Sequence, residues 1–176
     1  EPTDDGLELC VINDDDAPWV ATAHVVRRQS DGATSAEFRQ AISVPPRSVI
    51  RVPLTADIVE ASHPDAGFIV ASIGDERALW HLAPPTDAPR SAPPLDVTVT
   101  AVPGGVDIDI RAQWLARDVL VQPDRIHPDA TVDRGFTTLL PGETQTFRVR
   151  APVPLDPAWV DEPYVVASLR DIIDPD

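Results

Sequence analysis

Short stretches of alternating apolar and polar residues dominate this chain. In "LELCVIN" at 7–13, for example, the alternation places Leu7, Leu9 and Val11 on one face. Successive side chains of a strand point to opposite sides, so this period of two is typical of a strand with one buried face. The same pattern occurs at 19–28, 36–44, 48–54, 67–73 and 77–83. The first half is therefore predicted to be a set of short strands.

The second half repeats this organisation after a proline-rich interval. Strands are predicted at 95–102, 105–112, 114–122, 136–140, 143–151 and 164–172. "PGG" at 103–105 is predicted to join two of them as a hairpin, and "LPGE" at 140–143 has Pro and Gly at the central positions of a type II turn. The interval "APPTDAPRSAPP" at 83–94 has no apolar alternation and is predicted to be an extended linker.

Both halves contain one short phrase. It is "FIVASIGD" at 68–75 and "YVVASLRD" at 164–171, which lie 96 residues apart and share Val-Ala-Ser and a following Asp. A proline turn precedes each phrase by 23 residues, at Pro45 and at Pro141. Trp19 and Trp114 lie 95 residues apart and are expected to fill equivalent cores. The repeated segment, the proline turn before it and the tryptophan all recur after 95 or 96 residues, which predicts that the chain contains two copies of a single unit.

Strands and repeat together predict an all-β protein of two tandem immunoglobulin-like antiparallel β-sandwiches. The expected organisation is a sandwich at 1–83, a linker at 84–94 and a sandwich at 95–176. The second copy has "LDVTVTAV" ahead of "GVDIDIRA", whereas the first has only "EPTDDG" ahead of "LELCVIN". The first sandwich is therefore predicted to lack its N-terminal strand. Because the chain has no Met, we expect Glu1 to be a cut point within a longer protein or a processed end.

The net charge and the cysteine content limit which partners and which cellular compartment are expected. The net charge is −15, and such a field repels phosphate backbones, so nucleic acid is not an expected partner. No apolar run approaches the ~20 residues of a membrane span, and no membrane contact is expected. The single cysteine, Cys10, excludes an internal disulfide and is expected to be a buried thiol. Together with the lack of a visible signal peptide, this favours the cytoplasm over secretion.

No motif of known catalytic chemistry occurs. The glycines are scattered in turns, no G-x-S-x-G elbow is present, and the four histidines lie far apart without ligand spacing. Ser72 and Ser168, in the repeated phrase, are expected to be strand serines rather than nucleophiles. We therefore assign no catalytic residue, no cofactor and no metal ligand.

Two acidic loops and two tryptophans are the remaining candidates. The loops at 13–18 and 123–133 contain oxygen ligands of the kind Ca²⁺ takes, but neither follows the EF-hand pattern, so both are expected to be solvated turns. Trp80 and Trp159 have no counterpart in the repeat. Either could stack on a sugar ring, although packing at the edge of a core is the favoured interpretation.

The run "DVLVQPDRIHPDATVDRGFTTLLPGETQTFRVR" at 118–150 resembles the C-terminal immunoglobulin-like domain of β-mannosidases of glycoside hydrolase family 2. "ALWHLAPP" at 78–85 and "DDGLELCVINDDDAPW" at 4–19 resemble the passage between the last two domains and the start of the preceding one. The resemblance implies a parent enzyme that removes terminal β-linked mannose, within a family that also includes exo-acting glucosaminidases. Its catalytic glutamates lie in a (β/α)₈ barrel, and no residue of this chain matches their motifs.

The sequence therefore favours a non-catalytic accessory region from the C-terminus of a family 2 glycosidase, with the other domains of the parent as partners. One alternative is a carbohydrate-binding module that uses Trp80 or Trp159. A further alternative is a bacterial adhesion or surface module, in which the acidic loops would bind Ca²⁺.

Overall fold

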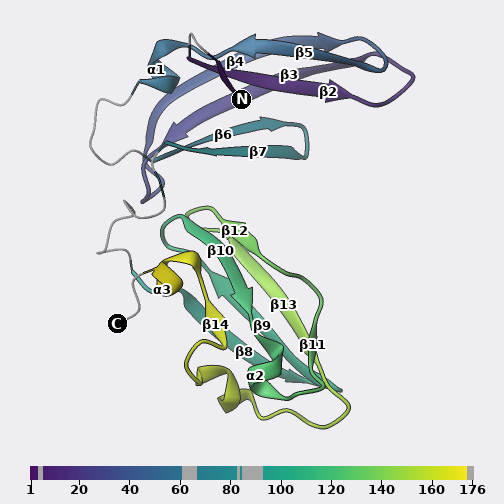
Figure 1. Ribbon diagram of the computed structural model, residues 1–176, viewed down its shortest axis with the longest axis vertical. Coiled ribbons are helices and arrows are strands. Elements are labelled where there is room, and N and C mark those ends of the chain that lie inside the picture. Colours follow the sequence, from purple (N-terminus) through teal and green to yellow (C-terminus); the bar gives the residue numbers. More distant parts are fainter. Residues whose placement is uncertain (4–5, 61–66, 83, 85–92, 174–176) are drawn as a thin grey trace. The chain divides into compact units, whose positions relative to one another are not determined.

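The computed structural model describes residues 1–3, 6–60, 67–82, 84 and 93–173. The chain divides into two compact units, Glu1–Pro84 and Pro85–Asp176 (Figure 1). Antiparallel sheets make up most of both units, which confirms the all-β prediction. Most of the predicted linker at 84–94 lies outside the described residues, and its extended form and the immunoglobulin type of the sandwiches stay predictions.

Unit 1 contains two antiparallel sheets, ordered β1-β2-β5 and β4-β3-β6-β7. A short helix, α1, follows β5 and contributes Ile58 to the core. The elements are β1 (Pro2–Thr3), β2 (Gly6–Asn13), β3 (Trp19–Arg28), β4 (Thr34–Val44), β5 (Ser48–Pro53), α1 (Ala56–Val59), β6 (Phe68–Ile73) and β7 (Glu76–His81).

Unit 2 also contains two antiparallel sheets, ordered β11-β13-β9-β8 and β12-β10-β14. The elements are β8 (Asp96–Val102), β9 (Gly105–Arg111), β10 (Ala116–Val121), α2 (Pro123–Ile126), β11 (Thr131–Val132), β12 (Thr137–Leu139), β13 (Thr144–Arg150), the 3₁₀ helix η2 (Pro157–Asp161), β14 (Val166–Ala167) and α3 (Leu169–Ile173). The predicted hairpin joins β8 to β9. The turn at 140–143 has its Glu143 N–H to Leu140 carbonyl bond and a positive φ of 86° at Gly142, as a type II turn requires.

The sequence repeat is also a repeat of strand pairing. Val25 of β3 lies opposite Ala71 of β6, and Leu120 of β10 lies opposite Ala167 of β14. In the same way β2 pairs with β5 and β9 pairs with β13. Val25 and Leu120 lie 95 residues apart, and Ala71 and Ala167 lie 96 apart, so the first of these pairings follows the offsets of the sequence repeat.

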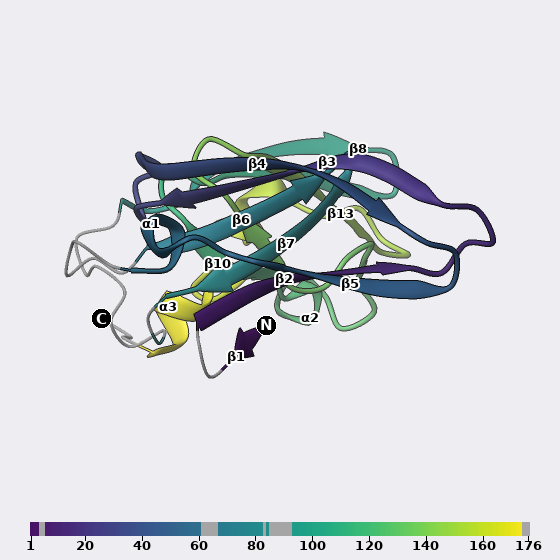
Figure 2. The ribbon, with the colours of Figure 1, turned by 90° about the horizontal axis from the view of Figure 1, so that it is seen from above.

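The two units differ at their first edge. β8 pairs with β9 over seven residues, whereas β1 pairs with β2 only at Pro2–Leu7 and Thr3–Gly6. Figure 2 shows β1 as a short arrow beside the beginning of β2. The prediction that the first strand of unit 1 is missing is therefore corrected, because a two-residue strand holds part of that edge.

The units differ again after the repeated phrase. In unit 1 the phrase forms β6 and turns into β7, but in unit 2 the strand β14 ends at Ala167 and helix α3 follows. The predicted strand at 164–172 was wrong over most of its length. Gly74 has a φ of 59° in the β6–β7 turn, and Arg170 stands at the equivalent place. Arginine disfavours that conformation and favours a helix, which explains the change.

Each unit has its own hydrophobic core. In unit 1 the buried residues form two clusters, one around Val11 and Val44 and one around Val25 and Ile58. In unit 2 they form a single cluster around Ile108 and Phe147, against which Leu95 and Val99 beside β9 pack. Trp19 packs on the first cluster of unit 1 as expected. Its counterpart Trp114 is partly buried in a bend before β10 and is not part of the strand.

None of the helices in the described ranges is long and apolar enough to cross a bilayer.

Candidate functional site

A groove with apolar and charged lining residues lies on unit 1. It runs between β2 on one side and the β6–β7 hairpin on the other, and we call it the β2–β7 groove. It consists of two cavities with volumes of about 150 Å³ and about 600 Å³. The cavities are adjacent, since both are lined by Leu9, Cys10, Ala71 and Ala78.

The groove exists because β2 is almost without a partner on this side. Two reciprocal backbone hydrogen bonds join Glu1 and Glu8. The Glu1 nitrogen donates to the Glu8 carbonyl at 2.8 Å, and the Glu8 N–H donates to the Glu1 carbonyl at 2.9 Å. Beyond Glu8 no described strand continues on this side of β2. The groove therefore lies where the sequence predicted a missing strand.

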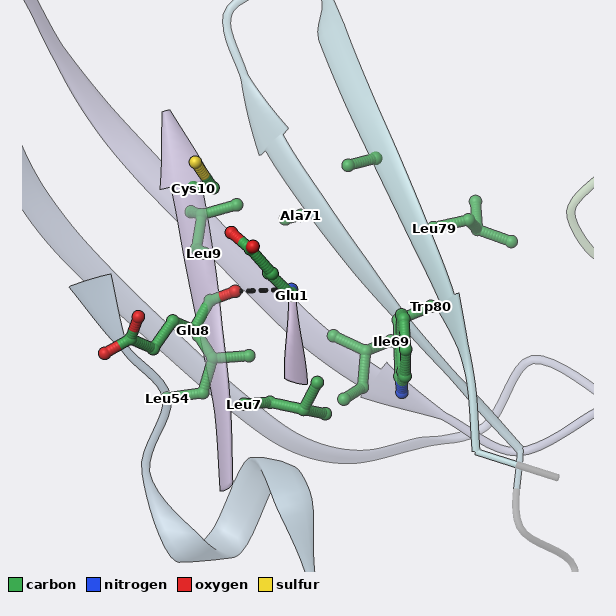
Figure 3. A pocket seen from close by; sticks show the side chains of 11 residues that line it. Glu1, Leu7, Glu8, Leu9, Cys10, Leu54, Ile69, Ala71, Leu79 and Trp80 are labelled. Atoms are coloured by element: carbon green, nitrogen blue, oxygen red, sulfur yellow. Dashed lines mark hydrogen bonds between the residues drawn. The ribbon is translucent and has the colours of Figure 1, made fainter. Parts of the chain in front are cut away.

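The smaller cavity has two charged lining residues, Glu1 and Glu8, among mainly apolar ones. Figure 3 shows Leu7 and Leu9 of β2 across from Ile69 and Trp80, with Glu1 between them. The carboxylates of Glu1 and Glu8 both lie near the guanidinium of Arg51 in β5, at 3.6 and 3.7 Å. These ion pairs are solvent-exposed and therefore weak. The site is thus an apolar trough with a charged rim rather than a polar reaction centre.

Trp80 is the predicted site residue that lies in this groove. It belongs to β7, stands opposite Ile69 of β6, and is 40% exposed. An indole that is both anchored on a sheet and exposed to solvent has an apolar surface on which a sugar or a peptide could pack. Cys10 also lines the groove as a free, partly buried thiol, whereas the sequence predicted a buried one.

Trp159 belongs to helix η2 of unit 2. Asp156 begins this helix by accepting a hydrogen bond from the Ala158 N–H at 2.9 Å. The next residue, Val160, is buried in the unit 2 core, which leaves Trp159 pointing outward with 40% of its surface exposed. The two predicted tryptophans thus belong to different units and line no common cavity among those described.

The acidic loop at 13–18 is organised by hydrogen bonds within unit 1. The side-chain amide of Asn13 donates to the carbonyls of Ala17, Val44 and Pro45 at 2.9 to 3.1 Å. The carboxylate of Asp16 accepts from the Arg47 guanidinium at 2.8 Å. These contacts explain the shape of the loop as a structural turn.

The acidic loop at 123–133 ends in a carboxylate with a strongly lowered pKa. Asp133 accepts hydrogen bonds from the Arg148 N–H at 2.8 Å, the Arg148 guanidinium at 3.1 Å and the Arg134 guanidinium at 3.3 Å. The Arg148 N–H is the largest cause that lowers its pKa to about 2, with Arg134 adding to it and partial burial acting against it. A general acid requires the opposite shift, so Asp133 is suited to hold structure.

No metal site emerges from these groups. Among the residues that the structure describes, no three His, Cys, Asp or Glu side chains are grouped so that they could hold an ion. The repeated serines occupy ordinary structural positions. Ser72 stands opposite His24 between β6 and β3, and Ser168 begins helix α3 with its hydroxyl and its N–H both donating to the Asp171 carboxylate at 2.7 Å. The second arrangement is one half of a capping box.

Solved structures with a similar fold are glycoside hydrolases. A β-D-mannosidase from Dictyoglomus thermophilum matches 96% of this chain with a TM-score of 0.60 at 15% identity, and 21% of that enzyme's chain is covered. An exo-chitosanase from Amycolatopsis orientalis matches 96% of this chain with a TM-score of 0.52 at 13% identity, and 25% of its chain is covered. At such identities the similarity is one of fold. The chain spans only a fifth to a quarter of these enzymes.

Comparisons of the sequence do not assign this chain to a family. No family model matches this chain, and no curated protein matches it.

Proposed function

We propose that this chain is a non-catalytic accessory region of a glycoside hydrolase, of the kind that ends the family 2 β-mannosidases. The observation that carries the proposal is the fold match, which covers 96% of this chain but only 21–25% of two glycosidase chains. The resemblance of 118–150 to the C-terminal domain of β-mannosidases supports the same assignment. The role is structural, and the partners are the other domains of the parent enzyme.

The arrangement of the candidate groups supports a role without chemistry. Glycosidases use one carboxyl group with a raised pKa beside a second carboxylate. Asp133 has its pKa lowered instead, and the Glu1 and Glu8 carboxylates of the smaller cavity are paired with Arg51. The smaller cavity of the groove is lined mainly by aliphatic side chains, which favour packing over proton transfer.

Hydrolysis assays test the proposal. The purified 176-residue chain is expected to release no nitrophenol from an aryl β-mannoside, whereas a full-length polypeptide that contains it is expected to do so. Turnover by the chain alone would show that it carries its own chemistry. A full-length polypeptide that cleaves no glycoside at all would contradict the assignment of the parent.

A carbohydrate-binding role is the second candidate, and one observation favours it. Trp80 is 40% exposed and lines a cavity of about 150 Å³ whose rim carries two carboxylates, Glu1 and Glu8. Carboxylates can accept hydrogen bonds from sugar hydroxyls while the indole packs on the ring.

A further inference from the structure

We infer that the β2–β7 groove is a docking site for one extended β-strand, which pairs antiparallel with β2 and is supplied by the rest of the parent glycosidase. The inference rests on the proposed function for the identity of the partner. Its physical basis is the open edge of β2 and the strand that covers the equivalent edge in unit 2.

The backbone of β2 has hydrogen-bonding groups directed at the open side. In an antiparallel strand the N–H and C=O of alternate residues point to opposite neighbours. Leu7 accepts from Leu54 on the β5 side, and Glu8 bonds with Glu1 on the other side. The same alternation directs Cys10 and Ile12 toward the open side, where no described strand pairs with them. An edge of this kind is a template for strand addition.

The position of β1 sets the register of the incoming strand. Because β1 runs antiparallel to β2 with Glu1 opposite Glu8, a strand that continues β1 past Glu1 would pass Leu9, Cys10 and Val11 in turn. Partners directly opposite each other lie on the same face of a sheet. The residues opposite Leu9 and Val11 would therefore point into the groove.

Unit 2 shows the chemistry that this strand needs. β8 covers β9 along its length and places Val97, Val99 and Ala101 opposite three β9 residues that are fully buried. On the other face of β8 stand Asp96, Thr98 and Thr100. The occupant of the groove is accordingly an extended segment with small apolar residues at alternate positions and short polar residues between them.

Two fusions that differ by one residue test the docking. In the first, the sequence "LDVTVTA" of residues 95–101 is joined directly ahead of Glu1, which places Ala opposite Leu9 and Val opposite Val11. In the second, "LDVTVTAV" of residues 95–102 is joined there, and the added residue turns the threonines inward. A shift of one residue exchanges the two faces of a strand. The two fusions therefore have nearly the same composition, but they direct opposite sets of side chains into the groove.

Amide hydrogen exchange at Cys10 and Ile12 is the readout, with the melting temperature beside it. The in-phase fusion is expected to slow exchange of both amides about tenfold or more relative to the shifted fusion, and to melt at a higher temperature. Equal exchange in the two fusions overturns the docking site. Replacement Cys10→Pro in the in-phase fusion should abolish the protection of Ile12, because it removes an N–H that faces the open edge but none that pairs with β5. Protection that survives this replacement also overturns it.

The partner is tested in the full-length glycosidase. There the Cys10 and Ile12 amides are expected to exchange more slowly than in the isolated chain, and equally fast exchange in both overturns the assignment of the strand to the parent. These measurements do not involve hydrolysis. A failure of the docking site therefore leaves the assays of the proposed function unchanged, and turnover by the isolated chain would contradict that function without altering the exchange result.

Discussion

The side-chain amide of Asn13 donates a buried hydrogen bond to the backbone carbonyl of Val44, 31 residues later and 3.1 Å away. Asn13 ends β2 and Val44 ends β4, so this contact ties the two sheets of unit 1 together at one end. The same amide also bonds to the carbonyls of Ala17 and Pro45. A single buried side chain thus closes both turns at this end of the unit.

Replacement Asn13→Ala is expected to lower the free energy of unfolding by roughly 1–3 kcal/mol, because it leaves buried carbonyls without their donor. Urea denaturation of the chain measures the effect. Asp16→Asn is a suitable control in the same loop, since it removes only an exposed ion pair with Arg47 and should cost less than about 1 kcal/mol. Equal losses in the two variants would show that Asn13 does not hold the turns.

The stability of the chain is expected to depend on pH through Asp133. Its pKa is lowered from 3.8 to about 2 in the folded chain, so the stabilisation is present above about pH 4 and is lost as the pH falls toward 2. Asp133→Asn should therefore destabilise the chain by roughly 1–2 kcal/mol at neutral pH, with a difference from the wild type that shrinks between pH 4 and pH 2. Chemical denaturation at a series of pH values measures this.

Arg148→Met provides the matched control for that experiment. It removes the guanidinium contact to Asp133 but keeps the backbone N–H, which is the largest cause of the lowered pKa. Most of the pH dependence should therefore persist in Arg148→Met. A pH dependence that is unchanged in Asp133→Asn would contradict the assignment.

The turn between β6 and β7 depends on the backbone conformation of Gly74. Its φ is 59°, and a Cβ added there would meet no atom within 4 Å, so the cost of a substitution is conformational rather than steric crowding by neighbours. Gly74→Val is expected to lower the free energy of unfolding by about 1–3 kcal/mol, and Gly74→Asn by clearly less, because Asn tolerates positive φ. Thermal unfolding distinguishes the two, and equal effects would refute this account of the turn.

Titration with mannan oligosaccharides is expected to give no saturable change in tryptophan fluorescence, because we assign the groove that contains Trp80 to the docking of a strand. Trp80→Ala and Trp159→Ala are the diagnostic variants, since both side chains are 40% exposed. A saturable change that is lost in Trp80→Ala and kept in Trp159→Ala would instead establish a carbohydrate site in the groove.

The strands of both units could be predicted from the sequence because each carries its own periodic pattern. Leu7 and Val11 are buried on one face of β2, as the alternation required. The repeat predicted two copies of one unit, and in the structure β6 pairs with β3 as β14 pairs with β10. The prediction of a strand from local pattern was wrong at 164–172. This segment has a strand-like composition, but hydrogen bonds between Ser168 and Asp171 cap helix α3 there instead.

The candidate site was only partly predictable. The shortened front of unit 1 could be inferred by comparing the two halves, and it marks the side on which the groove lies. The residues that line the groove opposite β2 could not be predicted, because they depend on which side chains of β7 lie across from β2 in the folded chain. The role of Asp133 was equally hidden, since its partner Arg148 lies 15 residues away on another strand.

The two units differ from each other at their first strand and at their last strand. Among the described residues, the front strand β1 of unit 1 has two residues and its last strand β7 has six, whereas unit 2 has seven residues in β8 and the helix α3 after β14. Each unit therefore has a strand whose counterpart in the other unit is short or is replaced by a helix. A superposition of one unit on the other would give a fuller set of strands than either unit has in its described residues.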